Sequence, residues 1–239
     1  MMESGRRTSE RSRSENKEVV PDVVWDGIRR GTTLNAKERA FRAKLADAAK
    51  QGQWENLLAL LRDAPECVNC TRPDGRSLYA PLHQAAFAGA SETVVHRLVE
   101  TGAWKTLQNV RGERPVDVAV RQGHRQLVGT LTPTLRYEVP TGVLLRIQEH
   151  FNAVIRSRAE HLVREHELRL PELQPLLELA LPKMWFPVPG MYGGFSYWLE
   201  ESGVNAKIVA ESWCRVSEGS GQRHEITSKG STLVGEGFV

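Results

Sequence analysis

The residue pair with the clearest potential for chemistry is Cys214 with His224. If a hairpin turns near residues 219 and 220, these side chains lie nearly opposite each other on neighbouring strands. A thiol beside an imidazole is the minimum for a cysteine nucleophile. A working dyad also needs an orienting group and an oxyanion hole, and the sequence displays neither, so we predict no catalytic residue.

Two further groups have spacings that invite a metal. Cys67 and Cys70 form C-x-x-C, which zinc sites and redox pairs both use, but zinc needs four ligands and no second pair accompanies this one. His161 and His166 are five residues apart, whereas metal-binding histidines need i, i+4 spacing to share a helix face. The sequence therefore predicts no metal and no cofactor, and it favours packing for the cysteines.

The elements that would position any site begin with a recurring motif of small residues that ends in glycine. Gly52, Gly89 and Gly123 close three copies and are 37 and 34 residues apart. A repeat of about 33 residues is typical of stacked helix pairs. The apolar stripe of the first copy predicts helices over residues 36–50 and 54–63.

Local signals mark the ends of these helices. Asn35 with Glu38 three residues later is a capping box, and Pro81 and Pro115 stand where a proline loses no hydrogen bond, at a helix start. The glycines suit the left-handed residue that ends a helix.

The second copy resembles the ankyrin repeat. Residues 74–76 read Asp-Gly-Arg and residues 80–86 read Ala-Pro-Leu-His-Gln-Ala-Ala, close to the family pattern D-G-x-T-P-L-H-x-A-A. Three extra residues, Ser77-Leu78-Tyr79, lengthen its turn, and the third copy has Asp117 where the family has histidine. The resemblance implies about three repeats that bind a partner protein through their turns and concave helix face, with a structural role for His83.

Partner-binding residues are predicted by position on those turns and helices, because aromatic and arginine side chains are enriched at interfaces. They are Arg76, Tyr79, Phe87, Trp104, Arg111 and Arg114. Packing of Leu78 and Tyr79 onto a neighbouring turn or onto the C-terminal region is an equally open alternative. A secondary site for an anion or a partner carboxylate is predicted at the hairpin tip, from Arg223 and His224.

The last third of the chain has a different pattern. Residues 140–167 have a long helical period and residues 171–181 a shorter one. Aromatic residues, glycine and proline then dominate residues 184–199, which predicts strands and turns. Residues 206–216, 222–227 and 231–234 predict a hairpin plus a third strand. The segments Met191-Tyr-Gly-Gly-Phe-Ser and Glu211-Ser-Trp-Cys-Arg-Val resemble the C-terminal extension of uncharacterised bacterial ankyrin-repeat proteins, which implies a bacterial origin.

Composition excludes some function classes. The formal net charge is only +3, and the arginines near the N-terminus alternate with glutamates, so no basic stripe for nucleic acid is expected. No apolar run approaches the roughly 20 residues of a membrane helix, and the first residues contain Arg and Ser without the apolar stretch of a signal peptide. We therefore predict a cytoplasmic protein without membrane or nucleic-acid partners.

Together these patterns predict a mainly α fold. Residues 1–34 are expected to be disordered or loosely packed, 35–133 to form the ankyrin-like array, and 134–239 to form a helix and a small antiparallel sheet. The predicted function is a non-enzymatic module that binds another protein. Two alternatives stay open: a bacterial immunity or antitoxin-like protein that holds a toxic enzyme, and an enzyme built on Cys214 and His224.

Overall fold

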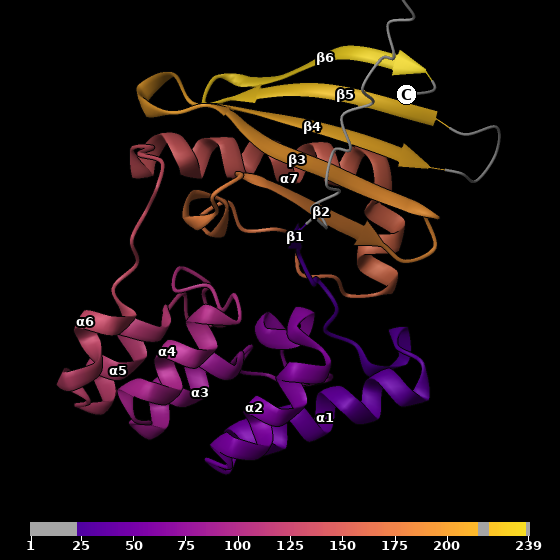
Figure 1. The fold of residues 1–239 in the computed structure, drawn as a ribbon. Helices are drawn as coiled ribbons and strands as arrows, with labels where there is room; N and C mark the ends of the chain where they lie inside the picture. The colour runs from indigo at the N-terminus through magenta and orange to yellow at the C-terminus, as the bar shows by residue number, and fades with distance from the viewer. Residues whose placement is uncertain (1–22, 215–219, 238–239) are drawn as a thin grey trace, which may run out of the picture.

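The computed structural model describes residues 23–214 and 220–237. The chain forms two layers, with stacked helix pairs in one and a twisted sheet with a long helix in the other (Figure 1). Residues 1–22, which include most of the segment expected to be loose, lie outside the described residues.

Three helix pairs form the first layer. Their bounds are α1 Ala36–Lys50 and α2 Trp54–Asp63, α3 Pro81–Ala88 and α4 Glu92–Glu100, and α5 Pro115–Gln122 with α6 Val128–Leu131. Short 3-10 helices stand between them: η1 Gly31–Thr33, η2 Pro65–Asn69 and η3 Arg125–Leu127. The limits of α1 and α2 match the predicted helices.

The predicted helix ends are confirmed. Asn35 accepts a hydrogen bond from the Glu38 backbone N–H at 2.9 Å while the Glu38 carboxylate accepts from the Asn35 N–H at 3.1 Å. Pro81 and Pro115 occupy the first turns of α3 and α5, and Gly89 follows α3 with φ of 64°. Because such a φ is costly for a residue with a Cβ, glycine ends the helix there.

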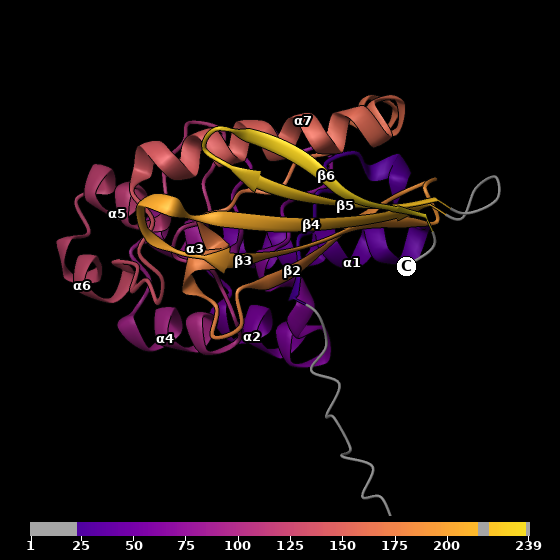
Figure 2. The ribbon, with the colours of Figure 1, turned by 90° about the horizontal axis from the view of Figure 1, so that it is seen from above.

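The second layer is a six-stranded sheet with strand order β1 to β6. Its strands are β1 Val23–Val24, β2 Lys183–Val188, β3 Gly193–Glu201, β4 Lys207–Cys214, β5 Ser220–Thr227 and β6 Gly230–Gly237. Strands β2 to β6 pair antiparallel, whereas β1 pairs parallel to β2. Helix α7 Thr141–Glu165 packs on one face of this sheet, and no described helix covers the other (Figure 2).

Alternation along the strands explains which face α7 covers. Tyr197 is fully buried and its ring lies 4.8 Å from that of Phe151 on α7. Residues two apart in a strand share a face, so Phe195 and Leu199 also point toward α7, and both are buried. Trp198, between them, points to the uncovered face, where Lys183 lies over its ring.

The mainly α prediction was wrong. Of the described residues, 46% are helical and 20% are in strands, with seven α-helices and a six-stranded mixed sheet, so this is an α/β protein. The strands predicted at residues 206–216, 222–227 and 231–234 correspond to β4, β5 and β6, and the segment 184–199, predicted as strands and turns, contains most of β2 and β3. β1 was not predicted because two residues give no periodicity.

One further helix prediction needs correction. The segment 171–181 was expected to be helical, but only a short 3-10 helix, η4 Pro175–Glu178, forms there. Another, η5 Gly203–Asn205, connects β3 and β4. Pro175 lacks a backbone N–H and stands at the start of η4, so no helical hydrogen bond can run back from it to residue 171.

The two layers share a hydrophobic core. Trp25, from the segment before the helix pairs, is 1% exposed and stacks on Trp104 with ring centroids 5.7 Å apart and planes 3° apart. The Trp25 indole also donates to the Arg169 carbonyl at 2.9 Å. Trp25 is therefore packed between the layers, and it belongs with Trp104 to the same buried cluster as α7 and the sheet.

Glu178 joins the layers with hydrogen bonds. Its carboxylate accepts from the backbone N–H groups of Lys105 and Thr106 at 3.2 and 2.8 Å, and from the Thr106 hydroxyl at 2.5 Å. A charged acceptor thus satisfies donors in the loop after α4 that would otherwise be unpaired.

Candidate functional site

The strand register separates the predicted cysteine–histidine pair. Cys214 pairs with Ser220, and His224 pairs with Ala210. His224 is thus four residues along β5 from Ser220, the residue opposite Cys214. At about 3.3 Å per residue, Cys214 and His224 are offset by roughly 13 Å along the ladder. The expected register needed a turn centred near 219, whereas the observed one places Ser220 already inside β5. The dyad on which the enzyme alternative depended is therefore not formed.

Arg223 and His224 do not make one site either. They are neighbours in β5, not at a hairpin tip, so their side chains point to opposite faces of the sheet. Arg223 lies over the Trp198 ring at 5.5 Å and 3.4 Å from a Glu211 carboxylate oxygen. His224 is half-buried, and burial together with the charge of Arg158 lowers its pKa.

No cluster of potential metal ligands occurs in the part of the chain that the structure describes. There, no three His, Cys, Asp or Glu side chains converge as metal ligands would. In the same residues, no helix combines the length and the apolar character that crossing a bilayer requires.

Two of the predicted partner-binding residues, Tyr79 and Phe87, lie together, one just before α3 and one within it. Tyr79, just before the helix, has its ring 6.1 Å from that of Phe87 and 5.5 Å from that of His83. Tyr79 is half-buried against the helix-pair core, whereas Phe87 is 45% exposed. The sequence left open whether Tyr79 folds back onto its neighbours, and the structure shows that it does.

Two residues that the sequence reasoning missed complete this group. The Arg121 guanidinium donates to the Tyr79 hydroxyl at 3.0 Å and to the two Glu113 carboxylate oxygens at 2.7 and 3.1 Å. Hydrogen bonds from Arg121 and then Asn109 lower the pKa of Glu113. The repeat spacing was the signal, since Glu113 and Arg121 follow Tyr79 and Phe87 by the spacing that separates Gly89 from Gly123.

The predicted arginines lie around this group. Arg114 precedes α5 and donates to Asp117 at 3.0 Å through its side chain. Although burial raises the pKa of Asp117, the hydrogen bonds from Arg114 lower it overall. Arg76 and Arg111 are exposed on the projecting turns. We call Tyr79, Phe87, Glu113, Arg114 and Arg121 the α3/α5 face.

Trp104 is not part of the α3/α5 face, and its assignment as an exposed partner-binding residue was wrong. The side chain is 6% exposed and is stacked on Trp25 in the core between the layers. Trp104 also lines a groove of about 880 Å³, together with Val23, Lys105 and Glu178. Trp104 was predicted to be at the surface because the C-terminal domain was expected to pack on the end of the repeat array and not over this residue.

His83 stabilises the α3/α5 face from the buried side of α3. It is fully buried, and its Nε2 donates to the Glu113 carbonyl at 3.2 Å, since a carbonyl only accepts. Burial lowers the pKa of His83 to about 4. The neutral imidazole thus ties α3 to the turn before α5, which is the structural role that was predicted.

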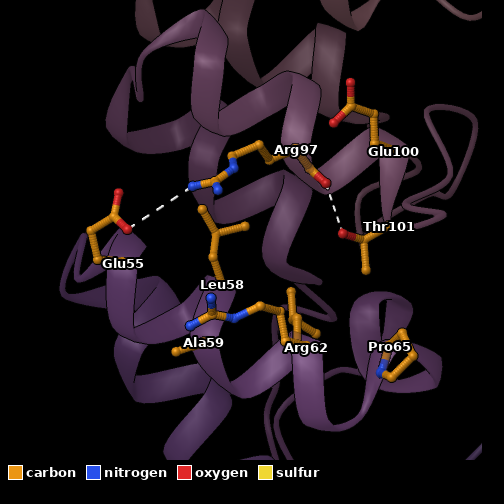
Figure 3. Close-up of a pocket in the computed structure, with 9 residues that line it drawn as sticks. Glu55, Leu58, Ala59, Arg62, Pro65, Arg97, Glu100 and Thr101 are labelled. Atoms are coloured by element: carbon orange, nitrogen blue, oxygen red, sulfur yellow. Dashed lines mark hydrogen bonds and ion pairs between the residues drawn. The ribbon is translucent and has the colours of Figure 1, made fainter.

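A second hollow lies between α2 and α4, with a volume of about 330 Å³. Figure 3 shows Arg97 extending toward Glu55 across it, while the Thr101 hydroxyl donates to the Arg97 carbonyl. The ion pair spans 4.0 Å, and the Glu55 side chain is 91% exposed, so it contributes little. With Arg62 and Glu100 also present, charges of both signs balance and favour no particular ligand.

Comparison with known proteins yields one partial relative. No protein-family model matches the chain. A probable E3 ubiquitin-protein ligase, XBOS32 of Oryza sativa subsp. japonica, is 35% identical over 88 residues, which are 37% of this chain and 17% of that protein. The chain thus spans about one sixth of that enzyme. The ankyrin resemblance and the bacterial origin stay predictions.

Proposed function

We propose that this protein is a non-enzymatic interaction module that binds another protein through the α3/α5 face. The observation that carries the proposal is Phe87, an aromatic side chain that is 45% exposed and yet fixed at its edge by the Tyr79 ring. Exposed aromatic side chains held in one orientation act as interface anchors because little side-chain entropy is lost on binding.

The polar groups around Phe87 supply a specific rim. Arg121 is held by Glu113 and Tyr79, and Arg114 is held by Asp117, so both guanidinium groups have fixed directions. Each retains donors that can reach partner carboxylates or carbonyls. The expected partner surface therefore has an apolar pocket for Phe87 with acidic or carbonyl groups beside it.

The alternatives differ in how well the geometry supports them. An enzyme at Cys214 and His224 is disfavoured by the strand register. The name of the Oryza sativa relative describes a probable ubiquitin-protein ligase, of which this chain spans only 17%. In the immunity or antitoxin-like alternative the partner is a toxic enzyme, and the same α3/α5 face would bind it.

The test is affinity capture with the full chain as bait, in bacterial lysate because of the predicted origin, followed by titration with the purified partner. Phe87→Ala is expected to weaken binding by about 2 kcal/mol, or roughly 30-fold in Kd, as truncation of an interface anchor does. Arg121→Ala removes a fixed donor and is expected to weaken binding about tenfold.

Leu145→Ala is the matched control, since Leu145 is a 55% exposed apolar residue on α7, away from α3 and α5. It should leave Kd unchanged, as should Cys214→Ser. A partner that binds the Phe87 and Arg121 variants as tightly as the unmodified chain would contradict the α3/α5 face. Loss of binding in Cys214→Ser alone would instead favour the enzyme alternative.

A further inference from the structure

Cys67 and Cys70 lie on one turn of a 3-10 helix. η2 spans Pro65–Asn69, and the Cys70 N–H donates to the Cys67 carbonyl at 3.0 Å. With three residues per turn and about 2.0 Å rise per residue, the two Cα atoms are stacked about 6 Å apart on the same side. A disulfide requires about 4.4–6.8 Å between Cα atoms. The backbone of η2 therefore already has the spacing that a Cys67–Cys70 disulfide requires.

The side chains are also paired. The interaction between the two thiols lowers the pKa of Cys67 and raises that of Cys70, and both residues are buried, with exposures of 9% and 6%. Packing alone accounts for two small buried residues, but it does not account for two thiols that interact across one turn.

A fixed cation stands beside this pair. Arg42, on α1, donates to Asp26 at 2.5 Å, and both side chains are only 14% exposed. The hydrogen bond from Cys70 and then the charge of Arg42 lower the pKa of the Cys67 thiol, against the opposing effect of burial. A cation and a thiol donor beside a cysteine are the groups that make it a nucleophile.

We propose that Cys67 and Cys70 are a thiol–disulfide exchange site whose substrate is a low-molecular-weight disulfide such as oxidised glutathione. The Cys67 thiolate attacks one sulfur of that disulfide, and the first glutathione leaves as a thiolate. Cys70 then attacks the Cys67 sulfur, breaks the mixed disulfide and releases the second glutathione. The two protons lost by the cysteines end on the two glutathione thiols, while the cysteine pair is oxidised and the glutathione disulfide is reduced.

The turn borders a groove and is held rigidly. Glu66 and Val68, the chain neighbours of Cys67, line the groove of about 880 Å³, although the two cysteines are not among its lining residues. Asn69, within the same turn, accepts from the Trp104 N–H at 3.0 Å and donates to the Gly102 carbonyl at 2.9 Å. These bonds hold the turn in the conformation that brings the sulfurs together.

The experiment incubates the reduced full chain with oxidised glutathione, blocks remaining thiols with a maleimide, and analyses tryptic peptides by mass spectrometry. Residues 63–76 form one tryptic peptide that contains both cysteines, because trypsin does not cleave between Arg72 and Pro73. The expected product is this peptide with an internal disulfide, two hydrogen atoms lighter and without glutathione. Cys214→Ser should leave this product unchanged.

Single variants separate the two roles. Cys70→Ser should retain glutathione on Cys67 as a stable mixed disulfide, and Cys67→Ser should react more slowly at Cys70. Arg42→Gln should slow the reaction about threefold for each unit by which the pKa of Cys67 rises, because a tenfold loss of thiolate is partly offset by stronger nucleophilicity. Arg42→Lys should restore the rate, and Arg39→Gln, on an exposed position of α1, is the control.

Two results would overturn the site. One is a peptide 63–76 that keeps both thiols under conditions where Cys214 has acquired glutathione. The other is faster modification of Cys70 in Cys67→Ser than of Cys67 in Cys70→Ser. Thermal unfolding of each variant, measured in parallel, distinguishes a lost reaction from a lost fold.

Discussion

Replacing His83 with glutamine should remove a defined part of the pH dependence of stability. His83 is fully buried, and burial lowers its pKa from the ordinary 6.5 to about 4. Glutamine keeps an N–H donor for the Glu113 carbonyl, which His83 Nε2 meets at 3.2 Å, but it has no titrating group. The variant therefore isolates the cost of protonation from the loss of the hydrogen bond.

The sign and size follow from the two pKa values. Above about pH 6.5 the imidazole is neutral in both the folded and unfolded states, and it imposes no protonation cost. As the pH falls below 6.5 the unfolded state takes up the proton first, so the folded state is penalised progressively until about pH 4. The penalty is about 2 kcal/mol at pH 5 and reaches about 3.4 kcal/mol well below pH 4.

Urea denaturation at about pH 7 and about pH 5 measures this difference. The free energy of unfolding of the unmodified chain should fall by about 2 kcal/mol more between these pH values than that of His83→Gln. His96→Gln, at an exposed position on α4, should behave like the unmodified chain. Equal pH dependence of His83→Gln and the unmodified chain would refute a neutral, buried imidazole.

Three further substitutions test the packing. Trp104→Ala should lower the free energy of unfolding by about 3–5 kcal/mol in urea denaturation, since it removes the ring stacked on Trp25; a loss below about 1 kcal/mol would contradict the shared core. Glu178→Ala should cost about 3 kcal/mol and speed hydrogen exchange of the two loop amides it accepts from, with Glu178→Gln costing about half; unchanged exchange would contradict those bonds. Gly194→Ala should abolish the near-UV circular dichroism of the folded chain, because its Cβ would lie 2.2 Å from the Phe186 carbonyl oxygen; a native spectrum would contradict the strand register.

The sequence was most informative where local rules decide the structure. The limits of α1, the capping box at Asn35 and the left-handed glycine after α3 all follow from contacts within a few residues. The long helix α7 was likewise predicted, because its apolar period extends over many turns.

What the sequence could not reveal depends on long-range contacts. Trp104 has the composition of an interface anchor, and only the packing of the second layer makes it a core residue. The Cys214 and His224 prediction failed because a shift in the strand register moves every pair along the ladder, and the sequence of the turn did not fix that register. Of the candidate site, Tyr79 and Phe87 were found by position, whereas Arg121 needed comparison of the repeats.

The hydrogen bond between Trp25 and Arg169 constrains the order in which the chain can fold. The Trp25 indole bonds a carbonyl 144 residues later in the chain. At about 5–20 residues per second of synthesis, Trp25 waits roughly 7–30 s before that partner exists. During this interval the aromatic surface that will join the layers is exposed, and closure of so large a loop comes late. A newly made chain is therefore most vulnerable to aggregation and proteolysis after its helix pairs have formed and before its sheet is complete.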